Sequence, residues 1–197
     1  HDLRTPITTL LAHLESLQMD DQPLSEQERR EYVAVAMRQS KRVARLVEQL
    51  LEAAKLDAQQ ITPSAESFPI GELLQDVVQK FSLAARERGV ALVSEVAPAN
   101  TRVYADIALL ERVFDNLIDN ALRHTPHGGR VVVSAIMNAE RVRLAVADSG
   151  SGMTPEEAAR VFDRFYRGDL GRSTTAGQAG LGLAIVKSIL ALHDATI

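Results

Sequence analysis

Apolar residues recur at intervals of three and four along the first 58 residues. One helix face is predicted by the run Ile7, Leu10, Leu11, Leu14 and Leu17. After a polar break, DDQPLSEQE, a second helix is predicted over Glu28–Asp57, and its seam has coiled-coil spacing at Val33, Ala36, Ser40, Val43, Val47, Leu50 and Ala54. Two narrow seams bury little surface in one chain, so we expect this helical hairpin to dimerise into a four-helix bundle.

The periodicity changes after a stretch rich in Pro, Ser and Gly, ITPSAESFPIG, which we interpret as a linker. Helices are predicted over Ile70–Arg88, Ile107–His124 and Leu181–Leu192. Strands are predicted over Val90–Val96, Thr101–Tyr104, Arg130–Met137 and Arg141–Ala147. This mixture, with some strands adjacent as hairpins, predicts an α+β layer in which helices cover one face of a mixed sheet.

Composition and net charge exclude several classes of function. The chain has 197 residues, 46% hydrophobic and 24% charged, enough for one or two ordinary cores. Its 26 acidic and 22 basic residues give a net charge of −4 without a basic block, which argues against a nucleic-acid partner. The absence of cysteine excludes disulfides, thiolate zinc sites and cysteine nucleophiles. No apolar run of eighteen residues is present, so we expect any membrane contact to lie in segments upstream of a fragment that lacks an initiator Met.

The helix FDNLIDNALRHTP carries the first candidate chemistry. Asn116 and Asn120 are four residues apart, so they share a face, and Arg123 follows on the same side. Amide oxygens can ligate Mg²⁺ and an arginine can clamp phosphate, so together they suit a metal–nucleotide. Taken alone, the pattern also fits two surface amides on an amphipathic helix.

The strand RVRLAVADSGSGM ends in Asp148, Gly150 and Gly152. A carboxylate there can accept a hydrogen bond from an exocyclic amine, and glycines let a flat base approach the backbone. By itself, this pattern fits a simple turn equally well.

The segment GQAGLGLAIVK places Gly177, Gly180 and Gly182 just before a helix, where free N–H groups bind phosphate. The order differs from the dinucleotide-binding G-x-G-x-x-G, and no P-loop pattern is present.

Five motifs in a fixed order make the chain resemble the cytoplasmic core of a sensor histidine kinase of two-component systems. They are HDLRTP, NLIDNALRHTP, DSGSGM, VFDRFYRGD and GLGLAIVK. The resemblance implies an all-α helical hairpin, forming a dimeric four-helix bundle, followed by an α+β two-layer sandwich of the histidine-kinase ATPase type. The implied domains are 1–58 for dimerisation and phosphotransfer, 59–68 as linker, and 69–197 for ATP binding, the last incomplete at its C-terminus.

The resemblance also implies residue roles and the cofactors ATP and Mg²⁺. His1 would be the phosphoacceptor and Asp2 the acid that orients and deprotonates its ring. Thr5, one helical turn beyond His1, could hold a water for hydrolysis of a regulator's aspartyl-phosphate, or it could cap the helix start. Asn120 and Asn116 would hold the metal, and Asp148 would read the adenine amine. The remaining nucleotide-binding residues implied are Arg123, His124, Gly150, Gly152, Phe162, Phe165, Arg167, Gly177, Gly180, Leu181 and Gly182, with Ser151 to Ala179 as a nucleotide lid.

The activity implied is ATP-dependent autophosphorylation of His1 and transfer to an aspartate of a response regulator, with phosphatase activity on that regulator. The exposed face with Thr9, His13 and Ser16 is where a regulator would dock. The implied location is the cytoplasmic part of a bacterial inner-membrane sensor. Gln178, where the family often has Gly, and the ending HDATI motivate an alternative, a non-catalytic dimeric nucleotide-binding scaffold. A related ATPase or serine kinase of the same nucleotide fold is a third alternative.

Overall fold

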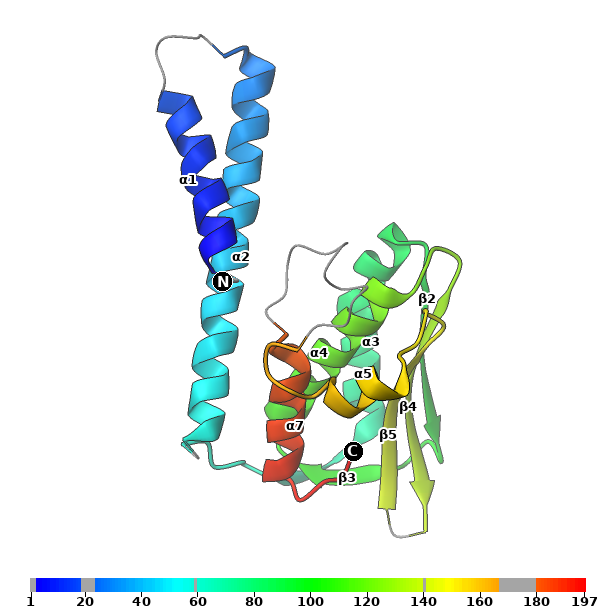
Figure 1. Cartoon of the computed structure of the whole chain (residues 1–197). Coiled ribbons are helices and arrows are strands. Elements are labelled where there is room, and N and C mark those ends of the chain that lie inside the picture. Colours follow the sequence, from blue (N-terminus) through cyan, green and yellow to red (C-terminus); the bar gives the residue numbers. More distant parts are fainter. Residues whose placement is uncertain (1–2, 19–23, 59, 140, 167–179) are drawn as a thin grey trace.

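The structure, a computed structural model, describes residues 3–18, 24–58, 60–139, 141–166 and 180–197. Its N-terminal part is a hairpin of α1 (Arg4–Gln18) and the longer α2 (Glu26–Asp57) (Figure 1). Helix α2 begins two residues earlier than predicted because Ser25 and Glu28 form a capping box. The Ser25 Oγ accepts the Glu28 N–H at 3.2 Å, and the Ser25 N–H donates to Glu28 Oε2 at 2.8 Å.

The predicted seam of α2 is not the surface that packs on α1 within one chain. Ala36 is buried, but Val33, Val47 and Leu50 are each at least 40% exposed. On α1, Pro6 is buried in the first turn, while three other apolar side chains are 39–51% exposed: Ile7, Leu11 and Leu14. A helix of a four-helix bundle has two contacting edges, and periodicity alone does not say which edge meets which neighbour.

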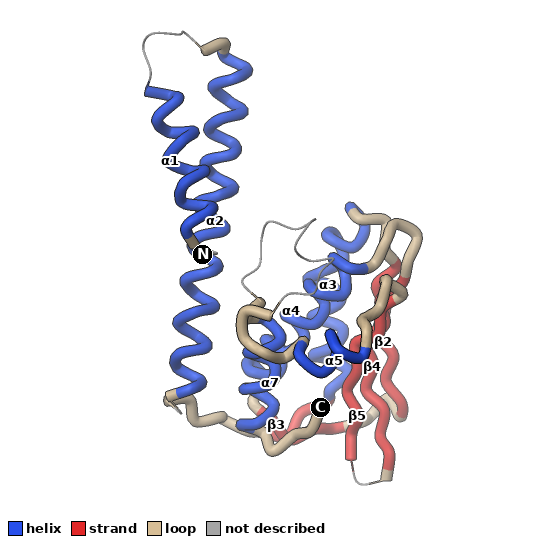
Figure 2. The backbone as a smooth tube through the Cα atoms, in the orientation of Figure 1, coloured by secondary structure: helices blue, strands red, loops and turns tan. Residues whose placement is uncertain are grey.

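Among its described residues, the C-terminal part contains a small two-stranded sheet, a three-stranded sheet and four helices (Figure 2). Its elements are β1 (Glu66–Pro69), α3 (Ile70–Glu87), β2 (Ala91–Ala97), β3 (Arg102–Ala105), α4 (Ile107–His124), β4 (Arg130–Asn138), β5 (Arg141–Asp148), α5 (Pro155–Arg160) and α7 (Gly182–Leu192). In the larger sheet β2 and β4 are parallel and β4 and β5 antiparallel, with the central pairs Val93–Val132 and Val132–Ala147. Helices α3, α4 and α7 lie on one side of it. The predicted α+β layer with a mixed sheet is confirmed.

Strand β1 differs from the expectation for its segment. The predicted linker, 59–68, ends in a strand that pairs antiparallel with β3, Phe68 opposite Val103. Phe68 is only 8% exposed. The Pro and Ser content of this segment is typical of a linker, so the short strand was not predicted. Pro69 is the last residue of β1, where a missing N–H is tolerated.

One apolar core joins the larger sheet to the helices. Alternate residues of β4, Val131, Val133 and Ala135, have no exposed surface. Ile118 of α4 and Ile189 of α7 are also fully buried and belong to the same cluster. Three side chains of α2 extend this cluster into the hairpin: Leu46, Ala53 and Leu56. The C-terminal half of α2 is therefore packed on the C-terminal part of the chain. Within the described ranges, no helix has both the length and the apolar character needed to cross a membrane.

Asp106 joins three segments that are distant in the sequence. Its carboxylate caps α4 by accepting the Leu109 N–H at 3.0 Å, and it accepts the Ser64 N–H of the linker at 2.8 Å. The Asp106 N–H donates to His193 Nε2 at 3.0 Å, while His193 Nδ1 lies 2.9 Å from the carbonyl oxygen of Ile189. A carbonyl only accepts, so these contacts assign the proton of His193 to Nδ1.

The capping role of Asp106 predicts a dependence of stability on pH. Burial raises the pKa of Asp106, but hydrogen bonds from the Leu109 and Ser64 N–H groups outweigh this, and the pKa lies below its usual value. The lowered pKa contributes stability that is complete above about pH 4 and lost as the pH falls further. We expect Asp106→Ala to cost about 1 kcal/mol at pH 7, measured by denaturant unfolding.

Asp106→Asn is the matched control, because asparagine caps helices well but does not titrate here. It should be less destabilising than Asp106→Ala at pH 7, and its difference from the wild type should shrink as the pH is lowered to about 3. A difference that stays constant from pH 7 to 3 would show that the charge of Asp106 has no part in the cap.

Candidate functional site

Helix α4 positions the first group of predicted site residues. Its apolar side, with Phe114 and Ile118, is buried, so the side with Asn116 and Asn120 is turned away from the sheet. The Asn116 Nδ2 donates to the carbonyl oxygen of Arg112 at 2.8 Å, which orients the amide and leaves Oδ1 as its acceptor end. Asn120 is half-buried one turn later.

Arg123 follows at the end of α4. Its side chain is 16% exposed and pairs with the Asp119 carboxylate, while Nε donates to Asp119 O at 3.2 Å. Burial lowers the pKa of Arg123, Asp119 opposes this effect, and the nearby charges of Arg88 and Arg45 add to it. Arg123 is thus a desolvated cation with one carboxylate partner and two cationic neighbours.

The glycine turn after β5 packs against the end of α4. Asp148 ends β5 with an exposed side chain, and its Oδ1 accepts the Gly150 N–H at 2.8 Å. A Cβ on Gly150 would lie 2.4 Å from the carbonyl oxygen of His124, so no larger residue fits without movement. The backbone at Gly152 has a φ of +70°, which favours glycine.

The second glycine segment meets the middle of α4. A Cβ on Gly182, the first residue of α7, would lie 2.8 Å from Asn116 Oδ1. Leu181 before it is 2% exposed, and no side chain caps the start of α7. Gly180 has a φ of +65°, and its own Cβ would lie 2.6 Å from the carbonyl oxygen of Tyr166. An uncapped N-terminus close to Asn116 presents backbone N–H groups of the kind that bind phosphate.

The predicted lid contains regular structure at its start. Helix α5 begins after a capping box between Thr154 and Glu157, a signal that the sequence T-P-E-E carries. Phe162 packs partly buried against the core, whereas Phe165 is 58% exposed. The Phe165 N–H donates to Gly180 O at 3.0 Å, which joins the two sides of the lid.

The structure thus places Gly182 against the Asn116 side chain and Gly150 against the carbonyl of His124, eight residues further along α4. Gly180 is hydrogen-bonded to Phe165. Four predicted site residues lie outside the described residues: His1, Asp2, Arg167 and Gly177. Thr5 is the second residue of α1 and exposed, so it lies inside the helix and is not its N-cap.

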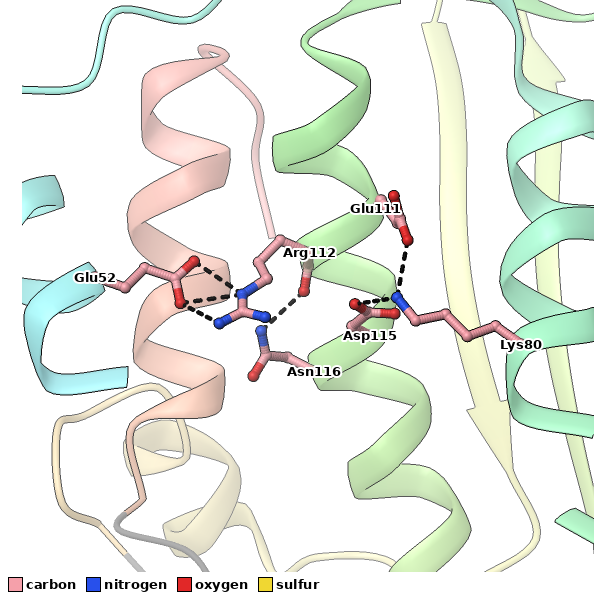
Figure 3. Close-up of polar contacts among 6 residues, drawn as sticks. All are labelled: Glu52, Lys80, Glu111, Arg112, Asp115 and Asn116. Carbon is pink, nitrogen blue, oxygen red and sulfur yellow. Dashed lines mark hydrogen bonds and ion pairs between the residues drawn. The ribbon is translucent and has the colours of Figure 1, made fainter. Parts of the chain in front are cut away.

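Two charged clusters on α4 were not predicted (Figure 3). Arg112 pairs with Glu52 of α2: Nε lies 3.0 Å from both carboxylate oxygens, and a terminal nitrogen lies 2.7 Å from Oε2. This pair raises the pKa of Arg112. Lys80 of α3 donates to Asp115 and Glu111, each at 2.8 Å, and both carboxylates raise its pKa, Asp115 more than Glu111. Sequence separations of 60 and 31–35 residues leave no local signal for either cluster.

Metal ligands are sparse in the described part of the chain, where no group of three or more His, Asp or Glu side chains could hold an ion. A cation here would therefore depend on amide oxygens and on the phosphates of a ligand, a donor set that suits Mg²⁺. Asn116 and Asn120 fit that arrangement.

Comparison with known protein families matches both parts of the chain. Residues 1–59 match the His Kinase A (phospho-acceptor) domain. Residues 105–197 match the Histidine kinase-, DNA gyrase B-, and HSP90-like ATPase family.

Curated relatives agree over the whole chain. The sensor-like histidine kinase SenX3 of Mycobacterium tuberculosis (strain ATCC 25618 / H37Rv) is 34% identical over 199 residues, covering 100% of this chain and 47% of that protein. The sensor protein SrrB of Staphylococcus aureus (strain N315) is 35% identical over 197 residues, covering 100% of this chain and 33% of that protein. The chain therefore spans between a third and a half of the length of these relatives.

Solved structures are similar in both fold and sequence. The histidine kinase AdeS of Acinetobacter baumannii matches with a TM-score of 0.77 and 26% identity, over 98% of this chain and 86% of that one. The mycobacterial sensor histidine kinase MprB matches with a TM-score of 0.55 and 31% identity, over 66% of this chain and 80% of that one. With two family models in order, relatives along its whole length and this shared fold, the chain belongs to the sensor histidine kinases, of which it forms phosphoacceptor and ATPase domains.

Proposed function

We propose that this chain is the kinase core of a sensor protein, which uses ATP to phosphorylate His1 and passes the phosphoryl group to an aspartate of a response regulator. The observation that supports this most is the meeting of three sequence motifs on α4. Asn116 touches the glycine that starts α7, and the carbonyl of His124 touches Gly150. These contacts gather candidate groups for base and phosphate on the domain that follows a phosphoacceptor hairpin.

The nucleotide would be held by different groups at its two ends. Asp148, at the exposed end of β5, would accept the exocyclic amine of adenine, with Gly150 and Gly152 allowing the base close to the backbone. The N–H groups at the uncapped start of α7 and the guanidinium of Arg123 would bind phosphate oxygens. The further nucleotide contacts that we propose are His124, Phe162, Phe165, Arg167, Gly177, Gly180 and Leu181.

Mg²⁺ would be bound by the amide oxygens of Asn120 and Asn116. When bound, it would neutralise charge on the phosphates during transfer. The Asn116 Nδ2 is already engaged by Arg112 O, so its oxygen is the atom left for a ligand.

In the transfer itself, a ring nitrogen of His1 forms a bond to the γ-phosphorus as the bond from that phosphorus to the β,γ-bridging oxygen breaks. ADP leaves with that oxygen. Asp2 orients the imidazole by accepting a hydrogen bond from the N–H of the other ring nitrogen, and it takes that proton as the new nitrogen–phosphorus bond forms. The phosphohistidine then gives its phosphoryl group to a carboxylate oxygen of the regulator.

We further propose a homodimer formed through the hairpin. Two stripes of exposed apolar residues favour it: Ile7, Leu11 and Leu14 on α1, and Val33, Met37, Val47, Leu50 and Leu51 on α2. A second hairpin would cover both stripes and complete a four-helix bundle. The domain limits proposed are 1–58, 59–68 and 69–197. The location proposed is the cytoplasmic part of a bacterial inner-membrane sensor.

The phosphoacceptor role of His1 is tested by incubating the protein with ATP labelled on its γ-phosphate and Mg²⁺. We expect label that is lost in acid and stable in alkali, because a phosphoramidate has this stability. His1→Ala should remove all of it. Label that persists in His1→Ala, or that is stable in acid, would favour a serine kinase, and ATP binding without any label would favour a scaffold.

The nucleotide site is tested by two substitutions with different expected effects. Asp148→Ala leaves a base edge unpaired and should weaken ATP binding by about 1–3 kcal/mol, with or without Mg²⁺. Asn120→Ala should weaken only the part of the binding that depends on Mg²⁺. Calorimetry with and without the metal distinguishes these effects, and wild-type affinity with intact metal dependence in both variants would contradict the assignment.

The phosphatase role of Thr5 is tested in the full-length protein. Thr5 is exposed on α1, so Thr5→Ala should leave the fold and the autophosphorylation of His1 unchanged. If its hydroxyl holds the attacking water, most dephosphorylation of purified phospho-regulator should be lost. Thr8→Ala is a matched control for the loss of a threonine hydroxyl, because Thr8 is also exposed on α1. Dephosphorylation by Thr5→Ala at the wild-type rate would reject the role.

A further inference from the structure

Helix α2 packs along α7, and the side chain of Glu52 reaches Arg112 of α4 (Figure 3). The Glu52–Arg112 pair sets the register between α2 and α4, and Glu52 is only 19% exposed. Leu46 and Ala53, on the same part of α2, are buried in the core that includes α4 and α7. The hairpin and the C-terminal part are therefore in contact along this part of α2.

The fixed register determines what else α2 presents to α4. Arg45 precedes Glu52 by seven residues, two helical turns, so it lies on nearly the same face about 10 Å along α2. Arg123 follows Arg112 by eleven residues, three turns, and likewise lies on nearly the same face about 16 Å along α4. Figure 1 shows that α2 runs downward and α4 runs upward, so residues that precede Glu52 on α2 and residues that follow Arg112 on α4 are displaced from the ion pair in the same direction.

Electrostatics agrees with this placement. The positive charge of Arg45 contributes to lowering the pKa of Arg123, so the two groups are near enough to interact. Asp119 is the carboxylate that pairs with Arg123. Arg45 is exposed, and the hydrogen bond found for it in the described ranges runs from Nε to the carbonyl of Lys41 at 3.4 Å. Its terminal nitrogens are therefore available to an anion.

We propose that Arg45 of the hairpin is a further phosphate-binding residue, held by the Glu52–Arg112 pair where it reaches the terminal phosphate of a nucleoside triphosphate bound on α4 and α7. This rests on the proposed function, since it requires the nucleotide on this side of α4. Repulsion between Arg45 and Arg123 is relieved when an anion lies between them, and the gain is largest for the most highly charged nucleotide. The hairpin would then contribute directly to distinguishing ATP from ADP.

The test compares binding of a non-hydrolysable ATP analogue and of ADP by calorimetry in the presence of Mg²⁺, using the whole chain. Arg45→Gln should weaken binding of the triphosphate about tenfold, as expected for the loss of one charged hydrogen bond, and leave ADP binding unchanged. Arg38→Gln is the matched control, because Arg38 is also exposed and lies one heptad before Arg45 on the same face. It should change neither affinity.

Equal affinities in Arg45→Gln and the wild type, with Asp148→Ala still weakened, would overturn the role of Arg45 while the nucleotide site stands. An equal loss of affinity for ADP and the triphosphate would also overturn it. So would a similar loss in Arg38→Gln, which would indicate that any positive charge on α2 has the same effect on binding. Absence of nucleotide binding by the wild type would remove both the proposed function and this inference. Circular dichroism of each variant verifies that it is folded.

Discussion

Burial of one side of α4 is the constraint on which the rest of the C-terminal half depends. Phe114 and Ile118 are almost fully enclosed between the sheet and the neighbouring helices. Since a helix repeats every 3.6 residues, fixing this side also fixes the direction of the polar side. Asn116 and Asn120 are presented together because the residues between and around them cannot turn away from the core.

Close backbone approach then completes the arrangement around α4. Gly150 lies against the carbonyl of His124, and Gly182 lies against the amide of Asn116. At Gly150 a methyl group would overlap the backbone carbonyl of His124, so glycine is required there by contact with α4. At Gly182 it would overlap the end of the Asn116 side chain and displace the amide from its position. The glycine motifs are thus packing surfaces as well as candidate ligand-binding loops.

Ion pairs on α4 fix its neighbours more than they stabilise it. Exposed pairs contribute little net free energy, and Arg112 and Lys80 are 41% and 49% exposed in their side chains. Their geometry is specific nevertheless: Arg112 engages both oxygens of Glu52, and Lys80 bridges two carboxylates of α4. These contacts, with the Asp106 junction, set how the hairpin, the linker and α3 meet one helix.

The sequence by itself determined the element types, the limits of α4, the mixed sheet and the family, because these depend on local periodicity and on motifs in order. It also identified Asn116, Gly150 and Gly182 as candidates. Only the tertiary structure decided that β1 is a strand, that the seam of α2 remains largely exposed in one chain, and that Glu52 meets Arg112. Such contacts join residues tens of positions apart, and they depend on how finished elements pack, for which neither periodicity nor residue type at a single position carries a signal.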